Sequence, residues 1–506
     1  MPDIHADVGN HDEVTMRNRI LEISGILSQN SCILFDMDGL WRRFACDSKA
    51  QEYGFQVIHV SDEMALRFNH EKAQISKSYT KLLLIIDDPA IYVPIDIARM
   101  YYIVRLSLST VFPNLSAEAL QELPGIDFDW LSASIKHLPF GELDKAQTLA
   151  WCRKGMYQAE NCREYGRSLL MTAQNRAQAA SSYKDWDIVA KCYGKAAMIQ
   201  HSGVSLPEWH ESRRAIEEAF VSWVNQKYKM LSGTVDRKRP VLLSKTADFI
   251  RRAADKVALV VMDGMSFENL FTIQREFADR DFSFSTNASF SFFPTVTAVA
   301  RQSVFSGKLP SEHAKPFSLD NEERQWIEFW KNEGFAESEV FFHKGIVDAL
   351  PANTKVAGIV VNIVDDLMHS ELQGFLGIQH GLSDWVQNGS LATMLRMFID
   401  NGYTVFMTSD HGNTSAIAKG RFSKPSVLVE SASRRAVLYD ASFDARELDK
   451  FDVIRYSGTY LPEGFVAYMF NADSCYGDSG KEYITHGGMT LEEAVVPFVR
   501  IGGRNG

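Results

Sequence analysis

The chain has 506 residues, of which 45% are hydrophobic and 23% charged, with a formal net charge of -11. This composition is typical of a globular protein with several domains, and the acidic balance argues against a general nucleic-acid coat protein. The six cysteines form no Cys-x-x-Cys pair, which favours reduced thiols over a disulfide framework. We find no signal-peptide pattern and no apolar run of membrane-spanning length, so we expect a cytoplasmic protein without a membrane partner.

The first hundred residues alternate between apolar runs and helical stretches. Residues 1–15 are polar and are expected to be disordered, and a helix is predicted over 14–29. The apolar runs are predicted to be strands at 32–35, 56–60 and 81–86. This alternation predicts a small parallel α/β domain over residues 1–100.

Carboxylates follow two of these strands. Asp36 and Asp38 lie in the stretch Asp-Met-Asp-Gly-Leu, and Asp87 and Asp88 follow the third strand. The first stretch is similar to the Asp-x-Asp-Gly-Thr start of haloacid-dehalogenase phosphatases, in which two carboxylates work with one Mg²⁺. Leu40 replaces the threonine, and no convincing catalytic lysine follows. We therefore interpret these aspartates as a non-catalytic cluster.

Residues 101–235 are predicted to be a helical middle region without strands. The clearest periodic helices are expected over 151–179 and 186–199. The basic stretch 234–240, which ends in Pro240, is interpreted as a solvated linker rather than a nucleic-acid site.

The α/β rhythm returns over 240–506, where a central, mostly parallel sheet flanked by helices is predicted. Strands are expected at 257–262, 356–364, 403–408, 434–440, 464–469 and 494–501, and helices at 266–279, 298–305, 322–334 and 390–401. Ligands of such sheets bind at the carboxyl ends of the strands.

Candidate metal ligands follow four of the apolar runs in this domain. They are Asp263, Asp365 with His369, Asp410 with His411, and His486. Because strand ends converge on one edge, we expect these side chains to meet. Asp and His without Cys suit Zn²⁺ or Mn²⁺, and Asp365 and His369 share one face of a helical turn. Asp366 competes with Asp365, but the four-residue spacing favours Asp365.

Three stretches of this half resemble a known family. They are Val-Val-Met-Asp-Gly-Met-Ser (260–266), Phe-Pro-Thr-Val-Thr-Ala-Val-Ala-Arg-Gln-Ser-Val-Phe-Ser-Gly (293–307) and Thr-His-Gly-Gly-Met-Thr-Leu-Glu-Glu-Ala-Val-Val-Pro (485–497). The order of the acidic and histidine residues resembles that of the metal ligands in the alkaline phosphatase superfamily. The amino-acid sequence of the three stretches resembles the PglZ domain within that superfamily. The resemblance covers about residues 240–500.

The resemblance implies a two-metal phosphoesterase site that uses Zn²⁺ or, as second choice, Mn²⁺. It assigns Asp263, Thr297, Asp410 and His411 to one metal, and Asp365, His369 and His486 to the other. Thr297 would be the nucleophile, and a phospho-threonine would then be hydrolysed by metal-activated water. Thr295 competes with Thr297, which related phosphodiesterases favour because it lies ten residues before Gly307. Arg301 would hold a phosphate oxygen or form a structural salt bridge.

By this resemblance the chain is a metal-dependent phosphodiesterase for a nucleotide, oligonucleotide or nucleic acid, with a role in phage defence or signalling. The alternatives are a phosphomonoesterase, a metal-dependent mutase, or a catalytically weak scaffold among the protein partners of a BREX-type defence complex. All seven expected ligands are present, which disfavours a decayed site.

Overall fold

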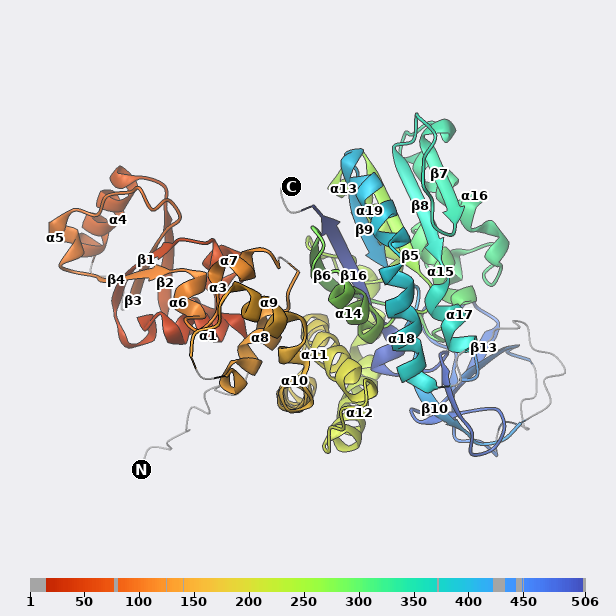
Figure 1. Cartoon of the computed structure of the whole chain (residues 1–506). Helices are drawn as coiled ribbons and strands as arrows, with labels where there is room; N and C mark the ends of the chain where they lie inside the picture. Colours follow the sequence, from red (N-terminus) through yellow and green to blue (C-terminus); the bar gives the residue numbers. More distant parts are fainter. Residues whose placement is uncertain are drawn as a thin grey trace, which may run out of the picture. The chain divides into compact units, whose positions relative to one another are not determined.

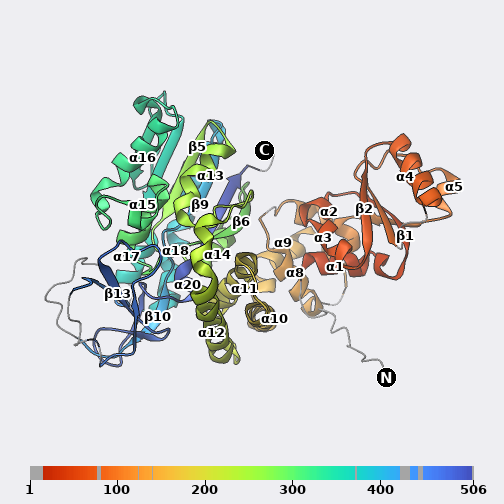
Figure 2. The ribbon, with the colours of Figure 1, turned by 180° about the vertical axis from the view of Figure 1, so that it is seen from behind.

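The computed structural model describes residues 15–76, 81–123, 125–139, 141–370, 373–421, 433–442, 448 and 450–503. The predicted disorder over residues 1–15 lies outside these ranges except at residue 15. The chain divides into two compact units, residues 1–168 and 169–506. Figures 1 and 2 show the elements of each unit from opposite sides.

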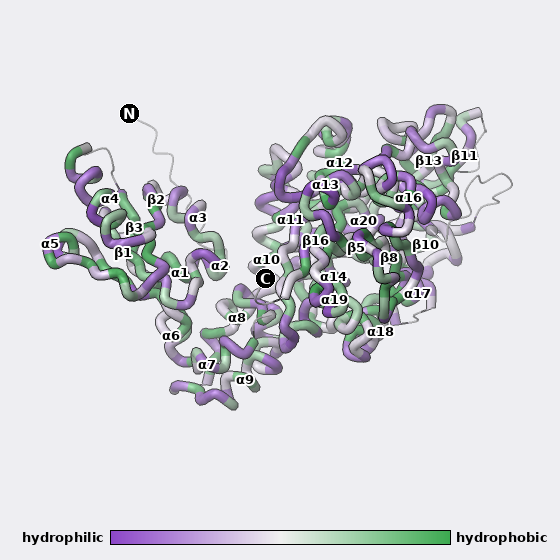
Figure 3. The backbone as a smooth tube through the Cα atoms, turned by 90° about the horizontal axis from the view of Figure 1, so that it is seen from above, coloured by the Kyte–Doolittle hydropathy of each residue, from purple (hydrophilic) through white to green (hydrophobic). Residues whose placement is uncertain are grey.

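The first unit is built on a parallel sheet of four strands. The strands are β1 (Ser31–Asp36), β2 (Phe55–Val60), β3 (Lys81–Ile86) and β4 (Tyr102–Leu106), in the order β2-β3-β1-β4. The apolar runs of β1 and β3 are almost wholly buried, and β3 falls among the hydrophobic (green) segments in Figure 3. The parallel α/β prediction for this region is therefore confirmed by the strand pairing.

The expectation that residues 101–235 contain no strand is wrong. β4 pairs with β1 along one edge of the sheet, and most of its side chains are exposed or half-buried. An edge strand with little burial lacks the continuous apolar run by which the other three strands are recognised.

Helices make up the rest of the first unit. They are α1 (Met16–Ile23), α2 (Leu40–Arg43), α3 (Cys46–Glu52), α4 (Glu63–Ser76), α5 (Ile95–Ala98), α6 (Leu108–Val111), α7 (Ala117–Gln121), α8 (Phe128–Ser134) and α9 (Lys145–Arg153), and α10 (Ala159–Gln178) crosses the division. The single helix predicted over 151–179 is broken at Gly155. A Cβ there would lie 2.3 Å from the Trp151 ring, so the packing of that ring requires glycine.

The second unit contains a central sheet of six strands. They are β5 (Val257–Met262), β6 (Ser283–Phe290), β7 (Val340–Lys344), β8 (Val356–Val361), β9 (Thr404–Thr408) and β16 (Val495–Gly502), in the order β6-β16-β9-β5-β8-β7. Strands β9, β5, β8 and β7 are parallel, whereas β16 is antiparallel to both neighbours. Every residue of β5 and β8 is buried. The predicted α/β class with a mostly parallel central sheet is confirmed.

Helices flank this sheet on both faces. They are α11 (Tyr183–His201), α12 (Trp209–Lys227), α13 (Thr246–Ala253), α14 (Phe267–Glu276), α15 (Thr297–Ser306), α16 (Glu322–Asn332), α17 (Ile363–Ser370), α18 (Gly374–Gln387), α19 (Ser390–Asp400) and α20 (Leu491–Ala494). Helices α18 and α19 lie in front of the sheet in Figure 1, and α15 and α16 in Figure 2. Helices α11 and α12 belong to this unit and contact α14 and α20 respectively.

Two small sheets complete the second unit. One contains β10 (Thr414–Ala418), β14 (Ser474–Cys475) and β15 (Glu482–Thr485), and the other contains β11 (Ala436–Asp440), β12 (Val453–Tyr456) and β13 (Phe465–Phe470). The strands predicted at 434–440 and 464–469 thus belong to a separate antiparallel sheet. The predicted domain limits 1–100, 101–235 and 240–506 stay predictions. Among the described residues, no helix is long and apolar enough to cross a membrane.

Candidate functional site

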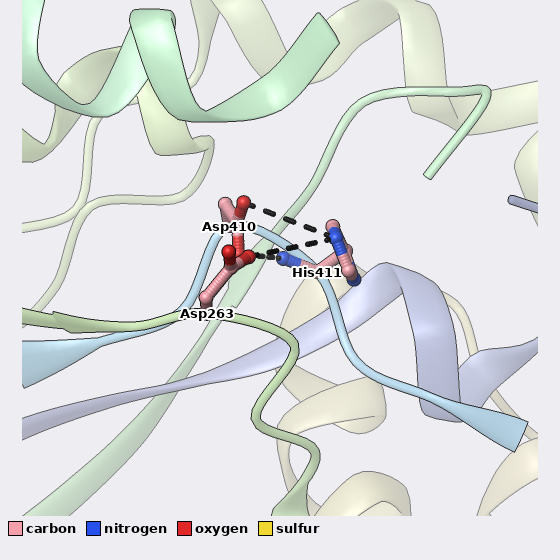
Figure 4. Close-up of side chains that lie close together, drawn as sticks. All are labelled: Asp263, Asp410 and His411. Carbon is pink, nitrogen blue, oxygen red and sulfur yellow. Dashed lines mark hydrogen bonds and ion pairs between the residues drawn. The ribbon is translucent and has the colours of Figure 1, made fainter. Parts of the chain in front are cut away.

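Two neighbouring parallel strands bring three buried ligand groups together. Asp263 directly follows β5, and Asp410 and His411 follow β9, which pairs with β5. Their side chains point toward one another in Figure 4. One ligand atom from each lies within 4.8 Å of the others, and no other set of three acidic, histidine or cysteine side chains in the described part of the chain is as compact.

Backbone and side-chain hydrogen bonds lock the two loops that carry these groups. Gly264 has a φ of +74°, and its amide donates to an Asp410 oxygen at 3.3 Å. The amide of Met265 donates to Ser409 Oγ at 2.9 Å, and Asn413 Nδ2 donates to the Gly264 carbonyl at 2.7 Å. The sequence analysis missed Ser409 and Asn413, because their partners lie more than 140 positions away.

The glycine of the Asp-His-Gly motif allows helix α20 to approach closely. A Cβ at Gly412 would lie 1.9 Å from the carbonyl oxygen of Glu492. The Gly412 amide also donates to the Glu493 carbonyl at 2.9 Å. Glu492 and Glu493 thus lie in the short helix α20, which packs against the loop.

The buried carboxylates of Asp263 and Asp410 lie close together, an arrangement that a divalent cation would stabilise. Burial and the negative charge of Asp410 raise the pKa of Asp263 well above its usual value. Burial opposes ionisation of Asp410, but the interactions with His411 and Arg301 and the hydrogen bond from the Gly264 amide together outweigh it and lower that pKa. One oxygen of each carboxylate, Asp263 Oδ1 and Asp410 Oδ2, is buried without a hydrogen-bond partner. Two orphaned carboxylate oxygens beside an imidazole are a suitable donor set for Zn²⁺ or Mn²⁺.

Hydrogen bonds orient both buried histidines. Nδ1 of His411 lies 2.9 Å from the Gly412 carbonyl, and Nδ1 of His486 lies 2.9 Å from the Thr295 carbonyl. A carbonyl can only accept, so each Nδ1 carries the proton and each Nε2 keeps its lone pair for a metal. The two rings stack with centroids 3.9 Å apart, and burial lowers the pKa of His486 to about 4, which keeps it neutral.

His486 reaches the site by a route that the sequence analysis did not expect. It follows β15 of a small sheet, whereas Asp263, Asp365 and Asp410 follow strands of the central sheet. The expectation that all four motifs follow strands of one sheet is therefore wrong for His486. The small sheet is held there because β10, which pairs with β15, follows the His411 loop.

The two candidate threonines have different surroundings. Oγ1 of Thr297, at the first residue of α15, lies 3.0 Å from Nε2 of His411. Thr295 is fully buried, and its hydroxyl donates to the Gly488 carbonyl and accepts from the Gly487 amide. The Thr295 hydroxyl therefore forms hydrogen bonds that fix the loop after His486. The Thr297 hydroxyl instead contacts His411, one of the candidate metal ligands.

The Asp365–His369 pair forms a second, more open part of the site. Both residues lie on α17, with Asp365 Oδ1 3.4 Å from His369 Nε2. Their side chains are 23% and 39% exposed, against 6% for Asp263 and 0% for His411. A Cβ at Gly264 would lie 3.7 Å from His411 Cε1 and 3.8 Å from the Asp365 amide nitrogen, so the start of α17 lies beside the buried group. Asp366 is exposed on the same helix.

Arg301 is part of a buried ion-pair network. Its guanidinium lies 2.5 Å from Asp263 Oδ2 and 2.6 Å from Glu322 Oε1, and its side chain is 5% exposed. Of the two roles expected for Arg301, the salt bridge is the one present. It partly neutralises Asp263 from the side opposite to the unpaired oxygen.

Comparison with known proteins identifies the C-terminal part. Residues 241–501, just over half of the chain, match the model of the BREX system PglZ alkaline phosphatase-like domain. No curated protein matches the chain. Similar solved structures include murine ectonucleotide pyrophosphatase/phosphodiesterase 5, inactive and in complex with AMP (14% identity, 50% of this chain, 88% of that chain, TM-score 0.35).

Another is phosphonoacetate hydrolase from Sinorhizobium meliloti 1021 in complex with phosphonoacetate (11% identity, 48% of this chain, 89% of that chain, TM-score 0.31). At these TM-scores the two likenesses support no conclusion about the chemistry of this chain. The family match has a different weight, because it spans the motifs that carry Asp263, Thr297, Asp410 and His486. The chain belongs to the PglZ family of alkaline phosphatase-like domains.

Proposed function

We propose that the second unit is a metal-dependent phosphodiesterase with Thr297 as its nucleophile. The observation that carries this proposal is the position of Thr297 Oγ1, 3.0 Å from His411 Nε2 at the rim of the buried Asp263–Asp410–His411 group. A hydroxyl beside a cation site, at the start of a helix, suits attack on a phosphate.

Two divalent metals would complete the site. Asp263, Asp410, His411 and Thr297 would hold one, and Asp365, His369 and His486 the other. Bound metals stabilise the developing charge on the attacking and leaving oxygens of phosphoryl transfer. Zn²⁺ is our first choice because imidazole and carboxylate donors predominate, and Mn²⁺ is the second.

The protein residues then have separate tasks. Thr297 gives up its hydroxyl proton to solvent and its oxygen forms a bond to phosphorus while the ester P–O bond breaks, and the leaving alkoxide takes up a proton from solvent. Water cleaves the resulting phospho-threonine and returns the hydroxyl to Thr297. Arg301 and the Gly264 amide hold Asp263 and Asp410 in place throughout.

The substrate we propose is a nucleotide or oligonucleotide phosphodiester, and the setting is a defence complex with protein partners. The family description, which names the BREX system, supports the setting. A phosphomonoester is the second candidate substrate, because the open Asp365–His369 side leaves room for a terminal phosphate.

The test is hydrolysis by the purified full chain, dialysed against chelator and reloaded with Zn²⁺ or Mn²⁺. Bis(p-nitrophenyl) phosphate and p-nitrophenyl phosphate serve as the diester and monoester. We expect metal-dependent turnover that is faster on the diester. No turnover of either compound with either metal would contradict the proposal and favour the scaffold alternative.

A further inference from the structure

A third buried carboxylate lies behind the candidate metal ligands. Glu322 begins α16, its side chain is 1% exposed, and its Oε1 lies 2.6 Å from Arg301 Nε. Nη1 of the same guanidinium lies 2.5 Å from Asp263 Oδ2. Arg301 therefore joins a candidate metal ligand to a carboxylate of another helix, and the mechanism proposed above gives this carboxylate no task.

The second oxygen of Glu322 is paired at the rim of the sheet. Lys344 Nζ lies 3.1 Å from Glu322 Oε2, and the Lys344 side chain is 51% exposed. Lys344 ends β7, where it pairs with Val360 of β8, and Val360 pairs with Val261 of β5. Because paired residues and alternate residues of parallel strands point to one face, this register puts Lys344 and Asp263 on the same face of the sheet. The four charged groups thus form a row that runs from the rim to the buried metal ligand.

The buried charges of this group balance when a divalent cation is bound. The carboxylates of Asp263, Asp410 and Glu322 belong to side chains that are 6%, 0% and 1% exposed. Arg301 is the buried cation that contacts two of them. With the carboxylates ionised and His411 neutral, two negative charges are left over, which one divalent cation neutralises. Without Glu322 the guanidinium would instead add an uncompensated positive charge beside the metal, and buried charges are costly unless they are paired.

A purely structural ion pair is the alternative interpretation. Such a pair would fix α15 on α16, so loss of the Glu322 charge would lower stability but leave the metal affinity of the folded protein unchanged. The position of the free oxygen favours a role in metal binding. Arg301 holds Asp263 Oδ2, whereas Oδ1, which lies 3.9 Å from His411 Nε2, is buried without a hydrogen-bond partner. The guanidinium leaves free the oxygen that a metal would take, and Glu322 fixes it in that position.

We propose that Glu322 is a positioning residue for the metal: it neutralises Arg301 and holds the guanidinium on Asp263 Oδ2, so that Oδ1 stays available for a divalent cation. The inference rests on the proposed function for the place of the metal, but not for hydrolysis. Loss of a group that hydrogen-bonds a metal ligand weakens metal binding about 10- to 100-fold. Because Glu322 acts through Arg301, we expect an effect at the lower end of this range.

The experiment measures the Zn²⁺ dissociation constants of the full chain by competition with a fluorescent chelator, and Asp410→Asn identifies the ion that the buried group holds. Glu322→Gln keeps the shape of the side chain and should weaken binding of that ion about 10-fold. Glu322→Asp keeps the charge and should recover part of the affinity. The matched control is Glu323→Gln, which removes the same charge from an exposed position one residue further along α16 and should change the constant by less than about twofold.

A second variant tests the direction of the effect without altering a buried residue. Lys344→Gln removes the half-exposed partner of Glu322 and frees that carboxylate for Arg301, so Zn²⁺ should bind about two- to fivefold more tightly. Its control is Lys355→Gln, because Lys355 is 53% exposed, pairs with Glu339 and precedes the amino end of β8. The control should bind Zn²⁺ as wild type does. If Glu322→Gln does not fold, this pair of variants decides, and equal constants in the two would overturn the inference.

Circular dichroism and diester hydrolysis are recorded for every variant, so that folding, metal affinity and turnover are compared in the same samples. If wild type binds Zn²⁺ and hydrolyses the diester, while folded Glu322→Gln binds Zn²⁺ as tightly as wild type, the inference is wrong and the proposed function stands. If wild type binds Zn²⁺ without hydrolysis and Glu322→Gln weakens the binding, the proposed function is wrong and the inference stands. A wild type that binds no Zn²⁺ would overturn both.

Discussion

In each unit an aspartate lies at the carboxyl end of a parallel strand, Asp36 in β1 and Asp263 after β5, but the surroundings of the two carboxylates differ. Asp36 ends β1 and is 3% exposed, and Oδ2 accepts a hydrogen bond from the Arg42 amide. Asp38 accepts from the Leu108 amide. Asp263 after β5 instead meets Asp410 and His411 from the neighbouring strand.

The comparison shows that a strand-end carboxylate does not make a site by itself. At the β1 edge Asp36 Oδ2 accepts from a main-chain amide, a single carboxylate oxygen, Asp36 Oδ1, is buried without a partner, and Arg42 pairs with Asp87. No imidazole approaches Asp36 among the described residues. At the β5 edge the second and third ligands arrive from β9, so two carboxylate oxygens remain without partners in one place. Convergence of several strand ends is therefore what distinguishes the β5 edge, where we propose the metal site.

The largest effect that we expect to distinguish the two edges is the loss of diester hydrolysis when Thr297 is replaced. Thr297→Ala removes the attacking oxygen but little volume, so hydrolysis of the diester should fall by several orders of magnitude. The melting temperature should change little, because Thr297 does not cap α15 and loss of its hydroxyl removes one hydrogen bond, which costs about 1 kcal/mol. Thr297→Ser should retain part of the activity, and Thr295→Ala should retain more than Thr297→Ala does. Full activity of Thr297→Ala would point to direct attack by water.

Much of this picture follows from the sequence, because β5, β8 and β9 are continuous apolar runs followed by acidic motifs. Because each acidic motif directly follows a predicted parallel strand, the sequence alone predicts that Asp263, Asp365 and Asp410 lie at one edge of the sheet. It could not place Asn413 or Ser409, because their partners come from distant segments and no local pattern marks them. The strand β4 was missed for the opposite reason, since an exposed edge strand has no strong pattern of its own.

The next effect concerns the support behind the functional edge. Arg213 of α12 lies 3.7 Å from Glu492 Oε1 and 2.9 Å from Thr414 Oγ1, and both Arg213 and Glu492 are largely buried. Arg213→Gln leaves Glu492 without its countercharge, so the free energy of unfolding should fall by about 3 kcal/mol. Urea denaturation measures this, with Arg421→Gln as a control expected to cost less than about 1 kcal/mol, because Arg421 forms an exposed ion pair with Asp478. Equal losses in the two variants would show that α12 does not support the loop.

A somewhat smaller effect is expected from metal on stability. Zn²⁺ at about 100 times its dissociation constant should stabilise the folded protein by about 2.7 kcal/mol, because it binds the folded state. Thermal unfolding after chelation and after reloading measures the shift. Asp36→Asn should leave the shift intact and Asp263→Asn should reduce it; the reverse pattern would move the metal to the first unit.

The smallest effect is expected at Asp36. Burial raises the pKa of Asp36, so its ionised form destabilises the folded state above that pKa. The contribution of Asp36 to the free energy of unfolding is therefore most favourable below the pKa that Asp36 has in the unfolded chain. This contribution falls as pH rises through the raised pKa of the folded state. Asp36→Asn should therefore be neutral or slightly stabilising at pH 7, with the difference disappearing at lower pH, and diester turnover should stay within a few-fold of wild type. A loss of turnover as large as that of Asp263→Asn would revive a phosphatase site at the β1 edge.

The claim that one edge and not the other binds metal is tested most directly by metal analysis of the purified full chain. Wild type, Asp410→Asn and Asp36→Asn are dialysed together against the same Zn²⁺ buffer and analysed by mass spectrometry, with circular dichroism to confirm folding. We predict that wild type and Asp36→Asn retain the same number of equivalents, about two, as a two-metal site requires. Asp410→Asn should lose at least one of them. Equal metal content in all three folded proteins would contradict the assignment of the β5–β9 edge as the metal centre.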